Sequence, residues 1–450
     1  MQVGLTNHSH CKEAPMDLVT SFAVLLQPLA ITMTAPSFDN FVTILTGWVF
    51  ARRRTVTGML TAAGMTGKRH HAAFHRLFAQ ARWSLDALGL AVFRILEPLL
   101  DKETIFLALD DTLARKRGLK MFGVGMHHDP LLSSRNKAIT NWGHSWVVLG
   151  VVVQLPLWPD RALCLPILFR MYLNHDAAER ARRAYRTRPE LAIEMLQVLC
   201  NHRKNRRFHL LADSAYGGQS VLCHLPANCD LTSRLVMNAR LYAAPPPRKP
   251  GANGRPRKRG ARLPTPAEML KSRGRRLTLN IYGRRDRVRV VDAAACVYAA
   301  PSRLLRIVAV EPLVGGRERQ AFYSTCTSAT PQEVLTWYAL RWSIEVAFHD
   351  SKQHLGFEEP QGWSRRAAER TAPVAMLLYS LIVYWFATEG HRHYKPLITS
   401  WYTKPRASFG DMLATLRRES LREQSFNWGL SGPGSQKILQ ALERTLALAA

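Results

Sequence analysis

The chain has 450 residues, with 62 Lys and Arg against 33 Asp and Glu, which gives a formal net charge of +29 at neutral pH. With 47% hydrophobic and 21% charged residues, the composition excludes a disordered basic tail, a collagen, a coiled coil and a disulfide scaffold, and the length allows about two to four domains. The charge excess favours a polyanionic partner, with nucleic acid first and an anionic membrane surface second.

Two apolar stretches lack the features of a membrane segment. Leu18–Met33 carries Gln27 and Pro28 and follows no basic n-region, so it fits neither a signal peptide nor a membrane span. Pro373–Ala387 is short and begins at a proline, which favours a buried core helix. The seven cysteines are scattered, with no Cys-x-x-Cys pair and no zinc-finger spacing. We therefore expect a protein of the reducing cytoplasm with no membrane partner.

Residues 36–97 have the pattern of helices. Thr55–Gly64 has apolar residues at helical spacing and stops at a glycine, and an amphipathic run from Phe74 to Trp83 follows a basic turn. A helix, a short turn and a second helix that opens on basic residues are typical of a helix-turn-helix, although an ordinary helical hairpin has the same pattern. The candidate DNA contacts in this turn are Lys68 and Arg69.

Beyond residue 100 the pattern becomes that of an α/β domain with a mixed sheet. An apolar strand-like run at Thr104–Leu109 ends in Asp110 and Asp111, and another at 208–212 ends in Asp213. Two strands and a long helix are expected between them, at 146–155, 162–169 and 175–202. Ligand sites lie beyond the carboxyl ends of sheet strands, but an aspartate there is also a common turn residue.

Residues 245–276 interrupt this order with a segment rich in Pro, Gly and Arg that contains one acid, Glu268. Because a solvated linker has no need of so much positive charge, we expect a basic loop that binds phosphates. Its candidate DNA contacts are Arg255, Arg257, Lys258 and Arg259. Residues 277–325 then alternate as strands do, which predicts an inserted β-sheet, and the chain is helical again from Pro331.

The segment Thr336–Gly356 is predicted to be one helix with four polar residues along one edge. At about 100° per residue, Tyr338, Arg341, Glu345 and Lys352 project within a stripe of about 60°, beside an apolar face that would bind the sheet. A structural salt-bridge ladder is the alternative, since Arg341 and Glu345 are i,i+4 partners. In so basic a chain, the full stripe favours a carboxylate site flanked by cations.

The spacing Tyr-x2-Arg-x3-Glu-x6-Lys resembles the signature around the third catalytic acid of bacterial insertion-sequence transposases of the DDE, RNase H-like superfamily. The segment LALDDTLARKRG is similar to the first acidic strand of that group, and HLLADSAYGG is similar to the second. The segment GRPRKRGARLP also looks like one found in related elements. The resemblance covers roughly residues 36–390.

The resemblance implies an RNase H-like core in which Asp111, Asp213 and Glu345 bind two divalent ions, Mg²⁺ or possible Mn²⁺, about 4 Å apart. Asp110 stays open as the alternative to Asp111, because neighbouring strand residues face opposite sides, while an Asp-Thr pair matches the family's first motif. Tyr338, Arg341 and Lys352 are then expected to contact DNA phosphates. The implied reaction cuts DNA at transposon ends and joins the freed 3′-OH to target DNA.

These expectations divide the chain into an N-terminal segment (1–35), a helical DNA-binding region (36–100), a catalytic domain (101–390, with a β-rich insertion at about 245–330) and a helical C-terminal region (391–450). Amphipathic helices at Met412–Leu421 and Ile438–Leu448 could serve dimerisation or simple packing. The expected partner is double-stranded DNA, both terminal inverted repeats and target, bound by a homodimer. Two alternatives stay open: an RNase H-like nuclease without strand transfer, and a catalytically idle DNA-binding protein derived from a transposase.

Overall fold

The computed structural model describes residues 15–427 except 135, 248–254, 256, 282–283, 315–317, 397–403 and 405. The chain forms two compact units, which are Met1–Arg82 together with Thr388–Ala450, and Trp83–Ala387. We call them the helical unit and the sheet unit. This division differs from the predicted boundaries at residues 35, 100 and 390, because the N-terminal and C-terminal helices belong to one unit and the helix that precedes the first strand belongs to the other.

The helical unit contains short helices around a core that includes Phe41, Trp48 and Phe74. Its elements are α1 (Thr20–Leu26), η1 (Gln27–Thr32), α2 (Ala35–Phe50), α3 (Val56–Ala62), α4 (Ala72–Ala79), η4 (Gly390–His393) and α13 (Phe409–Asn427). Residues 63–71 connect α3 to α4, which is longer than the turn of about three to four residues in a helix-turn-helix. DNA reading by this pair therefore stays a prediction. The predicted helix at Met412–Leu421 lies inside α13, whereas Ile438–Leu448 is outside the described residues.

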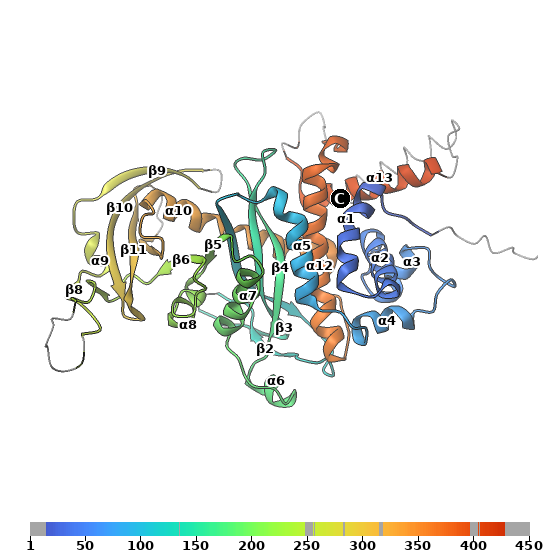
Figure 1. Ribbon diagram of the computed structural model, residues 1–450, viewed down its shortest axis with the longest axis horizontal. Coiled ribbons are helices and arrows are strands. Elements are labelled where there is room, and N and C mark those ends of the chain that lie inside the picture. Colours follow the sequence, from blue (N-terminus) through green and yellow to red (C-terminus); the bar gives the residue numbers. More distant parts are fainter. Residues whose placement is uncertain are drawn as a thin grey trace, which may run out of the picture. The chain divides into compact units, whose positions relative to one another are not determined.

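The sheet unit is an α/β structure around a mixed twelve-stranded sheet, which agrees with the predicted fold class (Figure 1). The strands of its first half are β1 (Thr104–Arg115), β2 (Gly125–His128), β3 (Thr140–Gln154), β4 (Ala162–Tyr172), β5 (Arg207–Ala212) and β6 (Cys229–Leu235). β1 lies between an antiparallel neighbour, β3, and a parallel neighbour, β5, and β4 pairs with β3. β1 and β3 therefore each have a neighbour on both sides, and their apolar runs at 107–109 and 146–153 are buried.

The predicted β-rich insertion continues the same sheet. Its strands are β7 (Leu241–Tyr242), β8 (Arg262–Leu263), β9 (Arg275–Ile281), β10 (Arg284–Val297), β11 (Ala300–Pro312) and β12 (Gln320–Ser324). Antiparallel pairing of β12 with β6 joins this half to the first. One side of it packs on α10 (Pro331–Leu340) through a core that includes Leu279, Val308, Phe322 and Val334.

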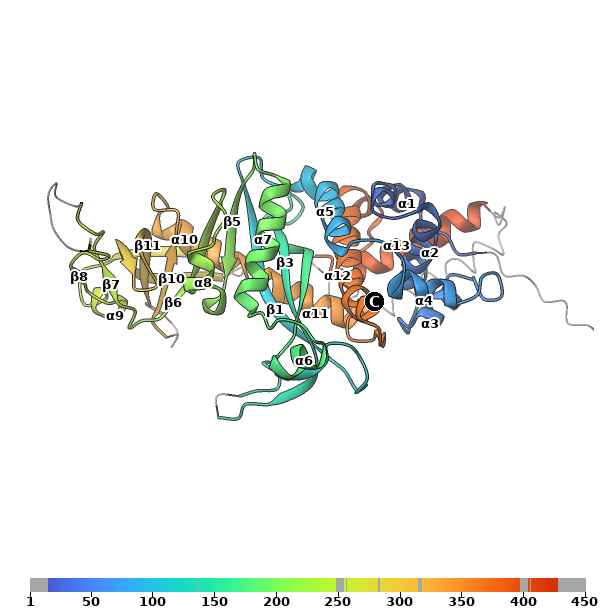
Figure 2. The ribbon, with the colours of Figure 1, turned by 60° about the horizontal axis from the view of Figure 1, so that its bottom comes forward.

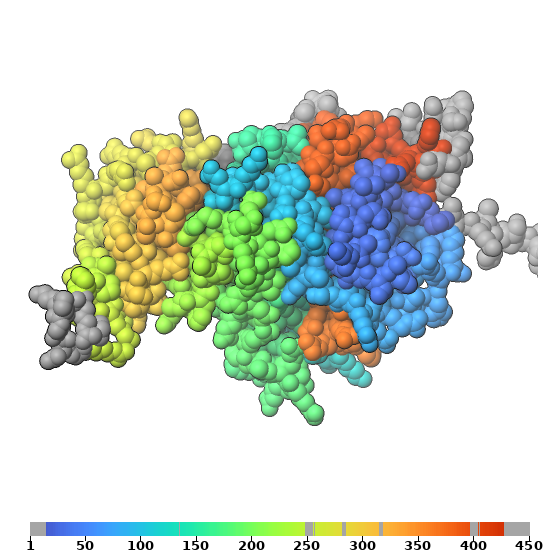
Figure 3. Space-filling model, viewed as in Figure 1, coloured from blue at the N-terminus to red at the C-terminus, as the bar shows by residue number. Residues whose placement is uncertain are grey.

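Helices cover both faces of the sheet. They are α5 (Leu85–Leu96), α6 (His175–Arg180), α7 (Arg188–His202), α8 (Gln219–Leu222), α9 (Pro266–Met269), α10 (Pro331–Leu340), α11 (Ser343–Leu355) and α12 (Arg365–Thr388). The space-filling view shows α5 and α7 side by side on one face of the sheet unit (Figure 3).

The α12 helix is the buried core helix that the apolar run at Pro373–Ala387 predicted. It begins at Arg365, however, so Pro373 lies inside the helix and not at its start. Among the described helices it has the length and composition to cross a membrane, but 83% of its most apolar window is buried inside the protein. This apolar segment is therefore explained by packing in the sheet unit.

Candidate functional site

The acidic pair Asp110–Asp111 lies in the middle of β1, and the prediction that the strand ends before the pair is wrong. Pairing with β3 continues as far as Arg115 opposite Gly143, so backbone hydrogen bonds carry the strand past both acids. Successive strand residues face opposite sides of a sheet. The two carboxylates therefore lie in different surroundings.

Asp110 faces α11. The Arg341 guanidinium donates to Asp110 over 2.5 Å and to Glu345 over 3.1 Å, so one cation bridges two carboxylates. Asp213 lies level with Asp110, because Ala212 at the end of β5 pairs with Leu109. Burial raises the pKa of Asp110 to about 7; Arg341 opposes this shift and the charge of Asp213 adds to it. Burial also raises the pKa of Glu345, with Arg341 again opposing and Asp213 adding.

Asp111 faces α7. It accepts a hydrogen bond of 2.9 Å from the Tyr216 hydroxyl and lies 3.3 Å from Nε of Arg188. Arg188 also donates to the Ser145 hydroxyl, and its guanidinium lies over the Tyr172 ring at 4.2 Å. Burial raises the pKa of Asp111; Arg188 and the Tyr216 hydrogen bond oppose the shift, and the charge of Asp213 adds to it, as it does at Asp110. This carboxylate thus has protein partners of its own.

Asp213 begins the short helix η3 (Ser214–Tyr216) immediately after β5. Its side chain accepts hydrogen bonds from the N–H groups of Ala215 at 2.9 Å and Tyr216 at 3.4 Å. Its carbonyl oxygen accepts from the Ser233 hydroxyl at 2.8 Å. Gly217 leaves room for this arrangement, because a Cβ there would lie 2.3 Å from Oγ of Ser233. The turn therefore fixes Asp213 at the carboxyl end of β5, and ligand sites of such sheets lie beyond the carboxyl ends of the strands.

The predicted continuous helix across Thr336–Gly356 is wrong. The chain forms two helices, α10 and α11, separated at Arg341 and Trp342. Across the junction backbone N–H groups donate to the carbonyl three residues earlier, as Arg341 does to Tyr338 and Glu345 does to Trp342. The Ser343 hydroxyl donates to the Leu340 carbonyl in the same way. This tighter winding turns the chain by about 120° per residue, so a projection at about 100° per residue does not hold across it.

Two of the predicted DNA contacts on this segment already have protein partners. The Lys352 ammonium donates to the Leu113 carbonyl of β1 over 2.7 Å and lies 3.7 Å from Glu358. Burial lowers the pKa of Lys352. The Tyr338 ring packs on Phe322 at 4.7 Å between ring centres. Lys352 therefore ties α11 to β1, and Tyr338 joins α10 to the second half of the sheet.

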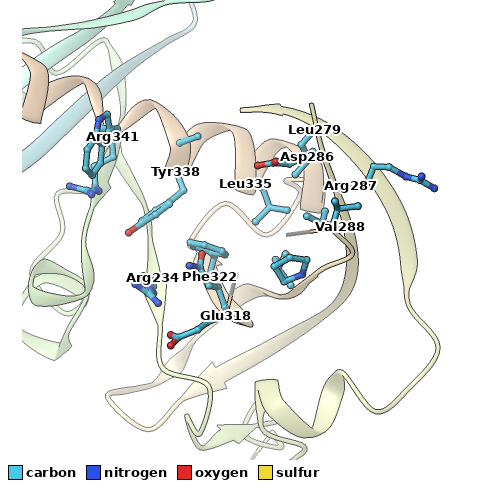
Figure 4. A pocket seen from close by; sticks show the side chains of 16 residues that line it. Arg234, Leu279, Asp286, Arg287, Val288, Glu318, Phe322, Leu335, Tyr338 and Arg341 are labelled. Atoms are coloured by element: carbon cyan, nitrogen blue, oxygen red, sulfur yellow. The ribbon is translucent and has the colours of Figure 1, made fainter. Parts of the chain in front are cut away.

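A cavity of about 350 Å³ opens beside Arg341, between α10 and strands β9 to β12 (Figure 4). Its wall includes Tyr338, Trp342, Phe322 and Arg234. Figure 4 shows the Tyr338 and Phe322 rings on neighbouring elements facing the hollow. Phe322 and Arg234 were missed by the sequence analysis, since strand residues far apart in the chain reach this wall only through the pairing of β6 with β12.

Arg188 and Tyr216 were also missed. Tyr216 stands three positions after Asp213 in the HLLADSAYGG segment, so the turn that follows a strand-terminal acid gave a signal for it. Arg188 opens α7 behind the capping residue Thr187, and no motif marks it.

The predicted basic contacts lie elsewhere. Arg255, Arg257 and Lys258 are exposed in the partly described loop before β8. Arg259 stacks over the Tyr298 ring at 3.8 Å. Lys68 and Arg69 are exposed in the helical unit, where Arg69 donates to Asn40.

We call the surroundings of Asp110, Asp213 and Glu345 the Asp110 face. Its candidate metal ligands are carboxylate oxygens, which hard divalent cations prefer. Arg341 bridges Asp110 and Glu345, and the pKa of both acids is raised, first by burial and also by the charge of Asp213. Arg341 now lies between two of the three. Within the described ranges no group of three or more His, Cys, Asp or Glu side chains is close enough to hold a metal ion.

A comparison with known protein families matches the part of the chain that contains β1 and β5. A family model described as DDE superfamily endonuclease matches residues 38–290, which is more than half of the chain. No curated protein matches. The family match includes β1 and β5 with their acids and ends before α10 and α11.

Proposed function

The chain belongs to the DDE superfamily endonucleases, and on that premise we propose that it is the transposase of an insertion sequence. It cuts phosphodiester bonds at the transposon ends and transfers the freed 3′-OH to target DNA. Because transposition joins two ends, the active form is a homodimer on double-stranded DNA that carries terminal inverted repeats.

The contact of Arg341 with both Asp110 and Glu345 carries this proposal. It brings acids from β1 and α11 together beside Asp213, although more than 230 residues separate the first from the last. We assign Asp213 and Glu345 to the catalytic acids, as the resemblance implied. For the first acid the contacts favour Asp110 over Asp111, because Asp111 faces α7 and is held by Tyr216 and Arg188.

Asp110, Asp213 and Glu345 would hold divalent cations, Mg²⁺ first, after Arg341 leaves its place between Asp110 and Glu345. Bound there, the cations would activate the attacking oxygen and neutralise charge on the phosphate. The remaining roles belong to the chain itself. Arg341 neutralises the acids before the substrate binds and lies where it can pair with a phosphate, and Trp342, which is 49% exposed, lies next to it at the open side of the helix junction.

The test uses the purified chain, duplexes from the DNA that flanks its gene, and a target plasmid, with and without Mg²⁺. Wild type should cut the ends and yield joined product, and Asp213→Asn and Glu345→Gln should do neither while still binding the duplex. Cutting without joined product would favour the nuclease alternative. Binding without cutting by wild type in either Mg²⁺ or Mn²⁺ would favour the idle DNA-binding protein.

A further inference from the structure

The chain between β1 and β3, residues 116–139, projects from the sheet beside α6 (Figure 2). We call it the β1–β3 arm. It pairs with β3 through β2, from Gly125 opposite Gly143 to His128 opposite Thr140. The catalytic proposal gives this arm no role, yet its surface has an unusual composition.

The end of the arm exposes large apolar side chains. Leu131 is 72% exposed and Leu132 is 53% exposed, at adjacent positions of one turn. Single exposed leucines are ordinary, but two on a projecting turn leave apolar area in water that burial against a partner would remove.

The turn that carries the leucines is fixed by hydrogen bonds. Asp129 is buried and forms a two-pronged ion pair with Arg115 at the end of β1, with N–O distances of 2.7 and 3.2 Å. The Leu131 N–H donates to the Asp129 carboxylate, and both the N–H and the hydroxyl of Ser133 donate to the Asp129 carbonyl. The leucines are therefore held outward by a braced turn, so their exposure follows from the fold.

The exposed charges of the arm are all positive within its described part. Arg117, Lys120 and Lys137 are exposed, and Asp129, the acid among the described arm residues, is buried and paired. A bridge from Ser134 to Lys137 places Lys137 beside the leucine turn. Apolar side chains flanked by cations are complementary to a DNA duplex, because the cations can pair with the outer phosphates while the apolar side chains contact the stacked bases inside.

The arm is also close enough to the acids to meet the same DNA. On β3, Val148 pairs with Asp110, and Thr140 pairs with His128 just before the leucine turn, so eight residues, or about 26 Å of strand at about 3.3 Å per residue, separate the two levels. A duplex advances about 3.4 Å per base pair, so this distance is about eight base pairs.

We infer that the β1–β3 arm is a DNA wedge, in which Lys137 contacts a phosphate while Leu131 and Leu132 insert between base pairs about eight steps from the scissile bond. This inference rests on the proposed function for the position of the wedge, though the binding of DNA by the arm does not require strand transfer.

The probe is a short duplex from the DNA that flanks the gene, with 2-aminopurine at one position at a time, bound to the full-length Asp213→Asn chain so that it is not cut. The expected result is a several-fold rise in fluorescence at one step, because 2-aminopurine brightens when it is unstacked. A Leu131→Ser/Leu132→Ser variant should lose this rise and keep its melting temperature. The matched control is Leu157→Ser, which changes a leucine that is 43% exposed in the β3–β4 turn and should leave the signal unchanged.

A second measurement separates the charge from the wedge. Lys137→Ala should keep the fluorescence rise at low salt and lower the salt slope of binding by about one. The wedge would be overturned by an unchanged fluorescence rise in the double serine variant or by an equal loss in Leu157→Ser. Failure of the chain to bind the duplex would overturn it as well. If the serine variant instead changes self-association without DNA or binding to anionic vesicles, while unstacking persists, the arm contacts protein or lipid. Failure of strand transfer with unstacking intact would count against the proposed function alone.

Discussion

Asp110 and Asp111 are adjacent on β1, but their side chains contact different partners on opposite faces of the sheet. Asp111 has a phenol that donates to it and a guanidinium beside it. Asp110 shares one guanidinium with Glu345, and the charge of Asp213 adds to the raised pKa of both. Burial raises the pKa of both acids, and they differ in their partners: Asp111 has two partners of its own, whereas Asp110 shares its cation with a second acid. Under the proposed function, this difference favours Asp110 as the catalytic acid and leaves a structural role to Asp111.

The largest effect is expected from removing one carboxylate charge at a time. Asp110→Asn should lower DNA cleavage by more than about a hundredfold. Loss of a group that only supports a metal ligand costs up to about a hundredfold, and this change removes a proposed ligand itself. Asp111→Asn keeps an acceptor for Tyr216 and should cost about tenfold or less. Single-turnover cleavage of a labelled duplex measures both, and retained DNA binding checks that the variants fold. An inactive Asp111→Asn beside an active Asp110→Asn would return the catalytic role to Asp111.

The pH dependence of stability should also depend on Asp110. Its pKa is raised from 3.8 to about 7, so between these values the native state binds a proton that the unfolded chain has lost, and stability should fall as pH rises through this window. About three pH units at about 1.4 kcal/mol each set an upper limit of about 4 kcal/mol.

Thermal melting without divalent ions at several pH values measures this loss, and Asp110→Asn should flatten the curve. Mg²⁺ binds the ionised carboxylates, so it should raise the melting temperature more above the Asp110 pKa than below it. Equal stabilisation by Mg²⁺ in the wild type and in Asp110→Asn would contradict the assignment of this acid.

The Asp111 face should respond in stability more than in catalysis. Tyr216→Phe removes a hydrogen bond to a charged group and should cost about 1.5–3 kcal/mol of unfolding free energy, because the hydroxyl is buried against Asp111. Chemical denaturation measures this cost. Combined with Asp111→Asn, the loss should be less than additive, since both changes break the same contact. A cleavage defect without a stability defect would place Tyr216 in the catalytic machinery.

Sequence patterns predicted the mixed α/β sheet and the strands of the insertion, because burial and alternation leave a local signal. They did not predict which face of β1 each aspartate takes, since this depends on the register against β3 and β5. The same limit applies to the helix break at Arg341, where i to i−3 bonding has no marker such as proline or glycine. The partners of Lys352 depend on a contact with β1, 239 residues away along the chain.

The smallest effect is expected from a change at Lys352. It tests whether the DNA-binding surface extends from the Asp110 face along α11. The Lys352 ammonium donates to the Leu113 carbonyl of β1, so Lys352→Met should lower the unfolding free energy by about 1 kcal/mol and leave the salt slope of DNA binding unchanged. Methionine keeps most of the side-chain volume, which limits any loss of packing. Binding titrations at several salt concentrations give the slope, and the exposed Lys258→Met serves as a comparison. A slope lowered by about one in Lys352→Met would instead show a phosphate contact, as the resemblance implied. In that case the lysine must leave the Leu113 carbonyl when DNA binds, and the Asp110 face would rearrange on binding while the Asp111 face stays in place.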